Sequence, residues 1–356
     1  MSDEGPTRST FLSYGKQYID DDDIQSVVAV LKSDYLTCGP TVDLFEREVA
    51  RYCGVEHAIA VCNGTAALHV AMFALGVKEG DEVIVPDITF VASSNAALYC
   101  GATPVFAEVD KRTLCVSAES IESLITPKTK LIVCVDMWGN PCDYDAISAI
   151  AQKHNLSLLA DAAHSVGAVY KGRKVGSLAH MTTFSFHPVK NITCGEGGMV
   201  LTNDAALALR ARMFRSHGID LDPVARARKG TALYDVAFLG YNYRLTDIHC
   251  ALGLSQFKKL DQFVAKRRQI AEWYRQKLSS VFNIHGGGEN KSLIELFDET
   301  NDSQASYHIF CVRIHFEKLS GGPSRDDFIR AMKSENIGVN VHYQVIHLFT
   351  LYKNLG

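Results

Sequence analysis

The stretch "FSFHPVKNITCGEGG", Phe184 to Gly198, decides the fold of this chain. Its apolar start predicts a buried strand, Pro188 stiffens the turn that follows, and the closing glycines allow the backbone to fold back. Between them stands one lysine, Lys190. A lysine beyond a strand is normally a solvated charge, so this position suggests a chemical role that the rest of the sequence must explain.

Short apolar runs alternate with helical patterns on either side of this stretch, from about residue 57 to 203. The runs are HAIAV, EVIVP, TPVFAEV, KLIVCV, LSLLAD, TTFSF and GMVLTND. This alternation predicts an α/β fold with a mainly parallel central sheet flanked by helices. A charged helix, the strand-like YHIFCVRIHF and a further helix follow residue 260, which predicts a smaller α+β domain. We therefore predict a large domain over residues 1–255 and a small C-terminal domain over 256–356.

Composition and short motifs exclude several classes of protein. Lys and Arg number 36 against 40 Asp and Glu, with no long basic run, so no nucleic-acid partner is expected. The N-terminus lacks the order of a signal peptide, which predicts a cytoplasmic protein. Ten scattered cysteines without C-x-x-C predict free thiols. Polar residues interrupt the apolar run from Ile59 to Val77, so no membrane span is expected, and no metal-ligand spacing is present.

An acidic run, Asp20 to Asp23, precedes a helical pattern in which Ile24, Val27, Val28 and Leu31 share one face. Carboxylates favour a helix N-terminus. The run is therefore interpreted as a helix start rather than a metal site.

Four features follow predicted strands, where open α/β sheets bind their ligands. Gly64 and Thr65 form a turn before a helix, which can hold a phosphate or simply end a strand. Asp161 can be a fixed counter-charge or a helix N-cap, and Phe90 can stack on a planar ligand or pack in the core. Lys190 would need burial or neighbouring positive charge to become a nucleophile at neutral pH.

In this order the features resemble the DegT/DnrJ/EryC1/StrS family of pyridoxal-phosphate-dependent sugar aminotransferases. The resemblance runs from about Tyr14 to the last residue. The matching blocks are SDYLTCGP, NGTAALH, ITFVASSNAALYCGATPVF, DAAHSVGA, FSFHPVKNITCGEGGMVLTND, RSHGI, LGYNYRLTDIHCALGLSQFKKLDQF and VNVHY. It implies the fold-type I architecture of these transferases, with pyridoxal 5'-phosphate (PLP) as the cofactor bound by the large domain.

The resemblance also implies roles for individual residues. Lys190 would attach the cofactor covalently and act as acid and base, and Asp161 would pair with the pyridine nitrogen. Phe90 would stack on the ring. The other implied cofactor contacts are Gly64, Thr65, Ala66, His164, Ser185 and Asn242. In a homodimer Asn242, with Arg244 near it, would complete the phosphate pocket of the neighbouring subunit. The residues implied to face the substrate are Tyr14, Asp34, Tyr35, Leu36, Thr37, His187, Arg244, His342 and Tyr343.

The implied reaction moves an amino group from L-glutamate to C4 of a UDP-linked 4-keto-6-deoxy sugar, as on the route to pseudaminic acid. KNITC is shared with the UDP-4-keto-pentose aminotransferases of lipid A modification, which leaves that substrate as an alternative. The dehydratase branch of the family has histidine in place of the lysine, so Lys190 argues against it. A catalytically inactive PLP-binding sensor or scaffold is the remaining alternative.

Three departures from the family pattern stand out. Ala160 replaces a common Glu, and Gln344 to Ile346 and Thr350 occupy positions where the family often has proline. The chain also stops at YKNLG, where the family continues for a few dozen residues. We therefore expect the small domain to be incomplete.

Overall fold

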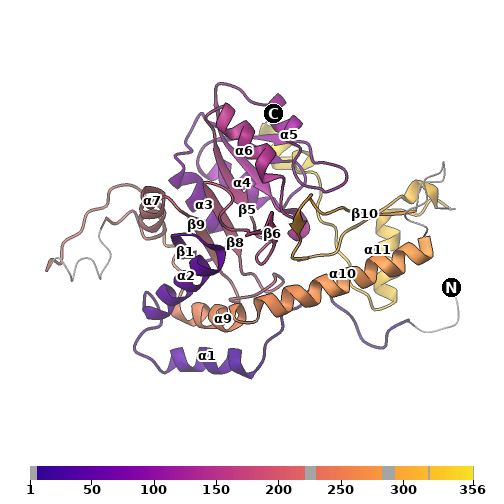
Figure 1. Ribbon diagram of the computed structural model, residues 1–356, viewed down its shortest axis with the longest axis horizontal. Helices are drawn as coiled ribbons and strands as arrows, with labels where there is room; N and C mark the ends of the chain where they lie inside the picture. Colours follow the sequence, from indigo (N-terminus) through magenta and orange to yellow (C-terminus); the bar gives the residue numbers. More distant parts are fainter. Residues whose placement is uncertain (1–5, 221–229, 283–292, 320, 356) are drawn as a thin grey trace.

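The computed structural model describes residues 6–220, 230–282, 293–319 and 321–355 (Figure 1). At its centre lies a seven-stranded sheet in the order β1-β9-β8-β5-β4-β2-β3. Its strands are β1 His57–Val61, β2 Glu82–Pro86, β3 Thr103–Ala107, β4 Thr129–Val135, β5 Ser157–Asp161, β8 Met181–Ser185 and β9 Gly198–Thr202. The pairs β2·β3, β2·β4, β4·β5 and β5·β8 are parallel, whereas β9 is antiparallel to both β1 and β8. The predicted α/β fold, with its mainly parallel sheet, is confirmed.

Helices cover both faces of this sheet, because successive strand residues point to opposite sides. Ala58 and Ala60 belong to one core layer, whereas Ile59 and Val61 belong to the other. The first layer includes residues of α2 (Pro40–Cys53), α5 (Ala118–Ser123), α6 (Tyr144–Lys153) and α9 (Asp247–Phe257). The second includes residues of α3 (Gly64–Ala74), α4 (Ala92–Tyr99) and α7 (Ala205–Arg215). Apolar layers therefore shield both faces of the sheet from water, and the ends and edges of its strands are left as the places where a ligand can approach.

Helix α1 (Asp21–Leu31) starts at the acidic run, as predicted. Asp20 caps it, and Asp20 and Asp23 form a reciprocal capping box. Ile24 and Leu31, on the face that the periodicity defines, are 49% and 54% exposed in the single chain. Helix α1 is fixed to α9 through a polar contact, in which the buried Asp23 accepts a hydrogen bond from Gln256 Nε2 at 2.6 Å.

The C-terminal region begins with α10 (Leu260–Phe282), the long helix that crosses the lower right of Figure 1. Strand β10 (Ile294–Leu296) pairs antiparallel with β12 (Val312–Ile314). Strand β11 (Ser303–Gln304) instead joins β6 (Val169–Tyr170), which also pairs with β7 (Arg173–Lys174). The remaining elements are the helices α11 (Arg325–Ser334) and α12 (Thr350–Leu355) and the short 3-10 turns η1 (Met137–Gly139), η2 (Phe316–Lys318) and η3 (Ile346–Leu348).

The predicted strand YHIFCVRIHF was largely wrong, since only residues 312–314 are extended and paired. Tyr307 has a φ of 49°, which strands do not accommodate, and Ser306 bonds to the large domain instead of to a neighbouring strand. This irregular segment reaches the candidate site, where Ser306 contacts His164.

All ten cysteines are free thiols, as the sequence predicts. Within the described ranges, no helix is long and apolar enough to cross a membrane.

Candidate active site

Lys190 lies just beyond the end of β8. Phe184 and Phe186 are fully buried and carry the chain out of the core. The turn closes with a hydrogen bond of 2.9 Å from the Lys190 amide to the carbonyl oxygen of His187. The lysine side chain is half-buried, and burial lowers its pKa to about 8, although the negative charge of Asp161 opposes that change. Lys190 therefore has far more of its neutral, nucleophilic form near neutral pH than a solvated lysine would.

Asp161 is the last residue of β5, and its negative charge interacts with the Lys190 amine. Only 5% of it is exposed, and burial raises the pKa of its carboxyl group. Ser93 Oγ donates to Asp161 Oδ2 at 2.6 Å, and the Ala163 amide donates to Oδ1 at 3.2 Å. A turn rather than a helix follows Asp161, so of its two earlier interpretations the N-cap is excluded. The geometry fits a fixed anion that gains from a nearby cation.

The turn between β1 and α3 packs against the ends of β8 and β9. A Cβ added at Gly64 would lie 2.8 Å from the Ser185 Cβ, and one at Gly198 would lie 2.4 Å from the carbonyl oxygen of Asn63. Asn63 caps α3 by accepting the Ala66 amide at 2.8 Å. Because the first amides of a helix lack intrahelical acceptors, Gly64 and Thr65 remain the favoured phosphate donors, whereas the amide of Ala66 is already used.

Aromatic and imidazole side chains gather around Lys190 and Asp161. Tyr343 lies 6.0 Å from Phe90, measured between ring centroids, and its hydroxyl is 3.2 Å from His164 Nε2. His342 lies 5.7 Å from Tyr14. The positive charge of Lys190 contributes to lowering the pKa of both His164 and His342, after burial. The structure thus brings together most of the predicted cofactor residues and three of the predicted substrate residues.

Other predicted residues lie outside this group within the single chain. The loop carrying Asp34, Tyr35, Leu36 and Thr37 is exposed and attaches to the start of α9, where the Asp247 amide donates to the Leu36 carbonyl. His187 is exposed as well. Asn242 is exposed, and its backbone forms an isolated β-bridge with Ser216. The backbone of Arg244 forms another with Val61, at the end of β1. The segment 242–244 therefore runs beside the strand that leads to the Gly64 turn.

Sequence reasoning missed three residues of this site: Asn63, Ser93 and His308. Asn63 directly precedes a helix, the usual position of a cap. Ser93 is a polar residue near the start of a short helix, three residues after Phe90. His308 is the titratable residue at the start of an apolar run, and 6% of it is exposed. Because the run YHIFCVRIHF was interpreted as a strand, the sequence did not indicate that His308 lies in the site.

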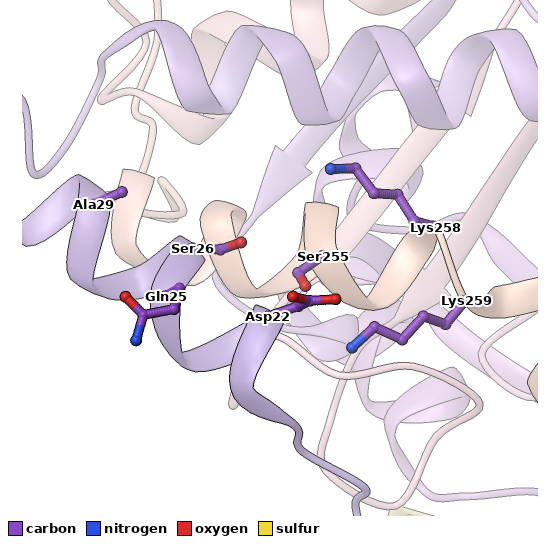
Figure 2. Close-up of a pocket in the computed structure, with 7 residues that line it drawn as sticks. All are labelled: Asp22, Gln25, Ser26, Ala29, Ser255, Lys258 and Lys259. Atoms are coloured by element: carbon purple, nitrogen blue, oxygen red, sulfur yellow. The ribbon is translucent and has the colours of Figure 1, made fainter.

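A different hollow lies between α1 and the end of α9 (Figure 2). It is lined by Asp22, Gln25, Ser26, Ala29, Ser255, Lys258 and Lys259. Lys259 already forms ion pairs with Asp20 and Asp23, so its charge is used in holding the two helices together. We assign no ligand to this hollow.

The sheet order, the half-buried lysine and the buried carboxylate are those of a PLP-dependent aminotransferase of fold type I. The DegT/DnrJ/EryC1/StrS aminotransferase family model matches residues 17–356, and the chain belongs to this family. It is 38% identical over 348 residues to the spore coat polysaccharide biosynthesis protein SpsC of Bacillus subtilis, covering 97% of this chain and 86% of that protein.

Two solved structures are similar over nearly the whole chain. PseC of Helicobacter pylori, an aminotransferase involved in pseudoaminic acid biosynthesis, has a TM-score of 0.86 at 31% identity, covering 97% of this chain and 88% of that one. The PLP form of the sugar aminotransferase Spr1654 of Streptococcus pneumoniae has a TM-score of 0.86 at 29% identity, with the same coverage of both chains. The protein is a PLP-dependent sugar aminotransferase.

The residues present fit PLP. A side chain at position 64 would clash with Ser185, so glycine there leaves the backbone amides of the turn and the Thr65 hydroxyl available to a phosphate. Asp161 is a buried carboxylate whose pKa burial raises, and a protonated pyridine nitrogen would supply the cation that stabilises its charged form. When bound, PLP supplies an electron sink that makes the donor's Cα–H acidic.

Proposed function

We propose that this enzyme transfers the amino group of L-glutamate to the C4 carbonyl of a UDP-linked 4-keto-6-deoxy sugar. The observation that carries the proposal is Lys190, a half-buried amine with a pKa of about 8 that stands beside a buried carboxylate. The similarity to PseC and the resemblance of YGKQYIDDDDI and GYNYRLTDIHCALGLSQ to the pseudaminic acid enzymes support the sugar.

Each residue of the site has a task in this proposal. Lys190 would hold the cofactor and, once displaced by the amino donor, would take the proton from the donor's Cα and deliver it to C4′ of the cofactor. Asp161 keeps the pyridine nitrogen protonated, and Phe90 covers the ring. Gly64 and Thr65 bind the phosphate. His342 and Tyr343 close the substrate side, with Tyr14 beside them.

We also propose a homodimer with a shared site. Leu233 and Leu239 are 80% and 81% exposed in the single chain, and they lie on the segment that leads into Tyr241 and Asn242. Exposed apolar groups of this size favour burial against a partner. In the dimer Asn242 and Arg244 would reach the neighbouring phosphate site, and residues 34–37 and His187 would face the sugar nucleotide. The division into residues 1–255 and 256–356, and the cytoplasmic location, remain predictions.

The first test is chemical. Protein purified with PLP should be yellow, and borohydride should fix the cofactor to the peptide that contains Lys190. Lys190→Ala should abolish this labelling, whereas the exposed-lysine control Lys153→Ala should leave it unchanged. Labelling that persists in Lys190→Ala would contradict the assignment of the lysine.

The second test concerns turnover and substrate. Glutamate alone should bleach the yellow form with stoichiometric 2-oxoglutarate, because the first half of the reaction needs no sugar; retained colour would favour a sensor. A panel of UDP- and dTDP-linked 4-keto-6-deoxy sugars and the UDP-4-keto-pentose then identifies the acceptor. A preference for the pentose, which KNITC allows, would replace the proposed substrate.

A further inference from the structure

The segment from Ala305 to His308 connects the C-terminal region to the two loops that follow β5 and β8. The Ser306 amide donates to the carbonyl oxygen of Gly139 at 2.9 Å. Ser306 Oγ donates to the carbonyl oxygen of His164 at 3.0 Å, and Asn191, the neighbour of Lys190, donates to the Ser306 carbonyl at 3.4 Å. One residue of this segment therefore contacts the loop after β5 and the loop after β8.

Two arginines of α10 hold the same segment from the other side. Arg268 Nε donates to the Ala305 carbonyl at 2.8 Å, and Arg267 Nη1 donates to the His308 carbonyl at 2.9 Å. Both bonds go from a charged donor to backbone, and such bonds are stronger than neutral ones. The backbone on both sides of Ser306 and Tyr307 is consequently held against α10.

The imidazole of His308 lies against that of His164. Their ring centroids are 4.5 Å apart at an angle of 40°, and each residue is at most 6% exposed. Among the described residues, neither Nδ1 atom has a hydrogen-bond partner. The opposite nitrogen of His164, Nε2, lies 3.2 Å from the Tyr343 hydroxyl, so the contacts run from His308 through His164 to Tyr343.

The surroundings keep both imidazoles neutral. Lys190, His308, His342 and Tyr343 face His164, and Lys190, His164, His342 and Arg267 face His308. Burial holds the pKa of both rings well below the ordinary value, and the positive charge of Lys190 adds to this effect in each. Neutrality matters because only a neutral imidazole has a nitrogen that can accept the Tyr343 O–H; in the imidazolium both nitrogens donate.

We propose that His308 is a positioning residue: its ring covers His164 and excludes water, so that His164 Nε2 accepts the Tyr343 hydroxyl and fixes Tyr343 beside Phe90. His308 acts through His164 and does not touch the reacting atoms. Its role serves the glutamate half of the reaction and is independent of which sugar is the acceptor.

The test compares His308→Ala, His308→Phe and the control His154→Ala, a histidine at the end of α6, all loaded with PLP. The visible spectrum of the bound cofactor and the rate of the glutamate half-reaction are recorded from about pH 5 to pH 9. In His308→Ala water reaches His164, whose pKa rises toward the ordinary value near 6.5. The Tyr343 contact should then be present above that pH and lost below it.

We expect His308→Ala to show a new spectral transition between roughly pH 5 and pH 7 and a rate about tenfold lower at the acid end. His308→Phe should keep the wild-type profile, because an aromatic ring still excludes water. His154→Ala should match wild type. Tyr343→Phe should show the lower rate at every pH, and adding His308→Ala to it should introduce no further pH step in the rate.

A folded His308→Ala enzyme with the wild-type pH profile would overturn the proposal. So would an equal loss at every pH in both His308 variants, because that would indicate a role for the imidazole nitrogen itself. Thermal melting establishes folding of each variant. If His308→Ala does not fold, His308→Phe and Tyr343→Phe decide the outcome. His308→Phe should then show the wild-type pH profile, and Tyr343→Phe should show the same loss of rate at every pH. Any other result contradicts the proposal.

Discussion

The central sheet and the C-terminal region obtain their order in different ways. Strand β4 has Leu131, Ile132 and Val133 at 0% exposure, between two complete layers of helices. Helix α11 has no buried residue, and β10 and β12 are half-exposed. The buried residues after position 293 include Phe297, Ala305, Ser306, Tyr307, His308, Ile346 and Tyr352. Ser306 and Tyr352 contact residues before position 200 directly, so the C-terminal region is buried mainly where it packs against the rest of the chain.

The largest stability effect should separate the two regions. Ile132→Ala leaves a cavity in a core that cannot collapse, and should lower the free energy of unfolding by about 2–5 kcal/mol. Met332→Ala, on the half-exposed face of α11, should cost less than about 1 kcal/mol. Urea denaturation of both variants measures the difference. Equal losses would mean that α11 is as well packed as the sheet.

The effect on activity should follow the same division. Asp161→Asn removes the fixed anion of the large domain and should lower the rate of the glutamate half-reaction about 10³-fold, or about 4 kcal/mol of barrier. Tyr343→Phe removes one hydroxyl contact from the C-terminal side and should lower it only about tenfold. Stopped-flow absorbance measures both. A larger loss in the tyrosine variant would reverse the assigned importance of the two regions.

Lys190 should destabilise the cofactor-free protein at neutral pH. Its folded pKa of about 8 is below the ordinary value of 10.5, so the folded state binds fewer protons between these limits and stability rises with pH across them. Lys190→Met should therefore be more stable than wild type at pH 7, by at most about 3 kcal/mol. The difference should shrink from about pH 8 upward and disappear near pH 10.5.

Thermal unfolding of the two cofactor-free proteins across this pH range measures the gap. A gap that is constant with pH would show that the lost charge is not its cause.

The smallest effect should come from the contact between α12 and α4. The Tyr352 hydroxyl lies 2.6 Å from both Ser94 Oγ and Asn95 Oδ1. Tyr352→Phe should cost about 1 kcal/mol and should speed amide exchange in α12 more than in the sheet. Tyr274→Phe, a half-exposed tyrosine on α10, is the matched control. Faster exchange throughout the sheet would show that this contact also stabilises the core.

The sequence predicted the sheet well because each strand is an apolar run of the right length between turn signals, and buried parallel strands require that pattern. It pointed to Asp161 and Lys190 because one ends such a strand and the other stands in the turn after one. Helical periodicity placed Ile24 and Leu31 on one face of α1, but it could not show what covers that face. His308 was missed because its segment is placed by the hydrogen bonds of Ser306 to Gly139 and His164, which are distant in the sequence and leave no local signal.

The antiparallel partner of β1 also affects how the chain is made. His57 pairs with Thr202, so β1 leaves the ribosome long before the strand that completes it. At about 5–20 residues per second, the roughly 140 residues between them take on the order of 7–30 s to synthesise. Throughout that interval the strand ending at the phosphate turn has no edge partner from β9. The sheet edge beside this turn is therefore completed late in biosynthesis, after the other strands of the central sheet have emerged.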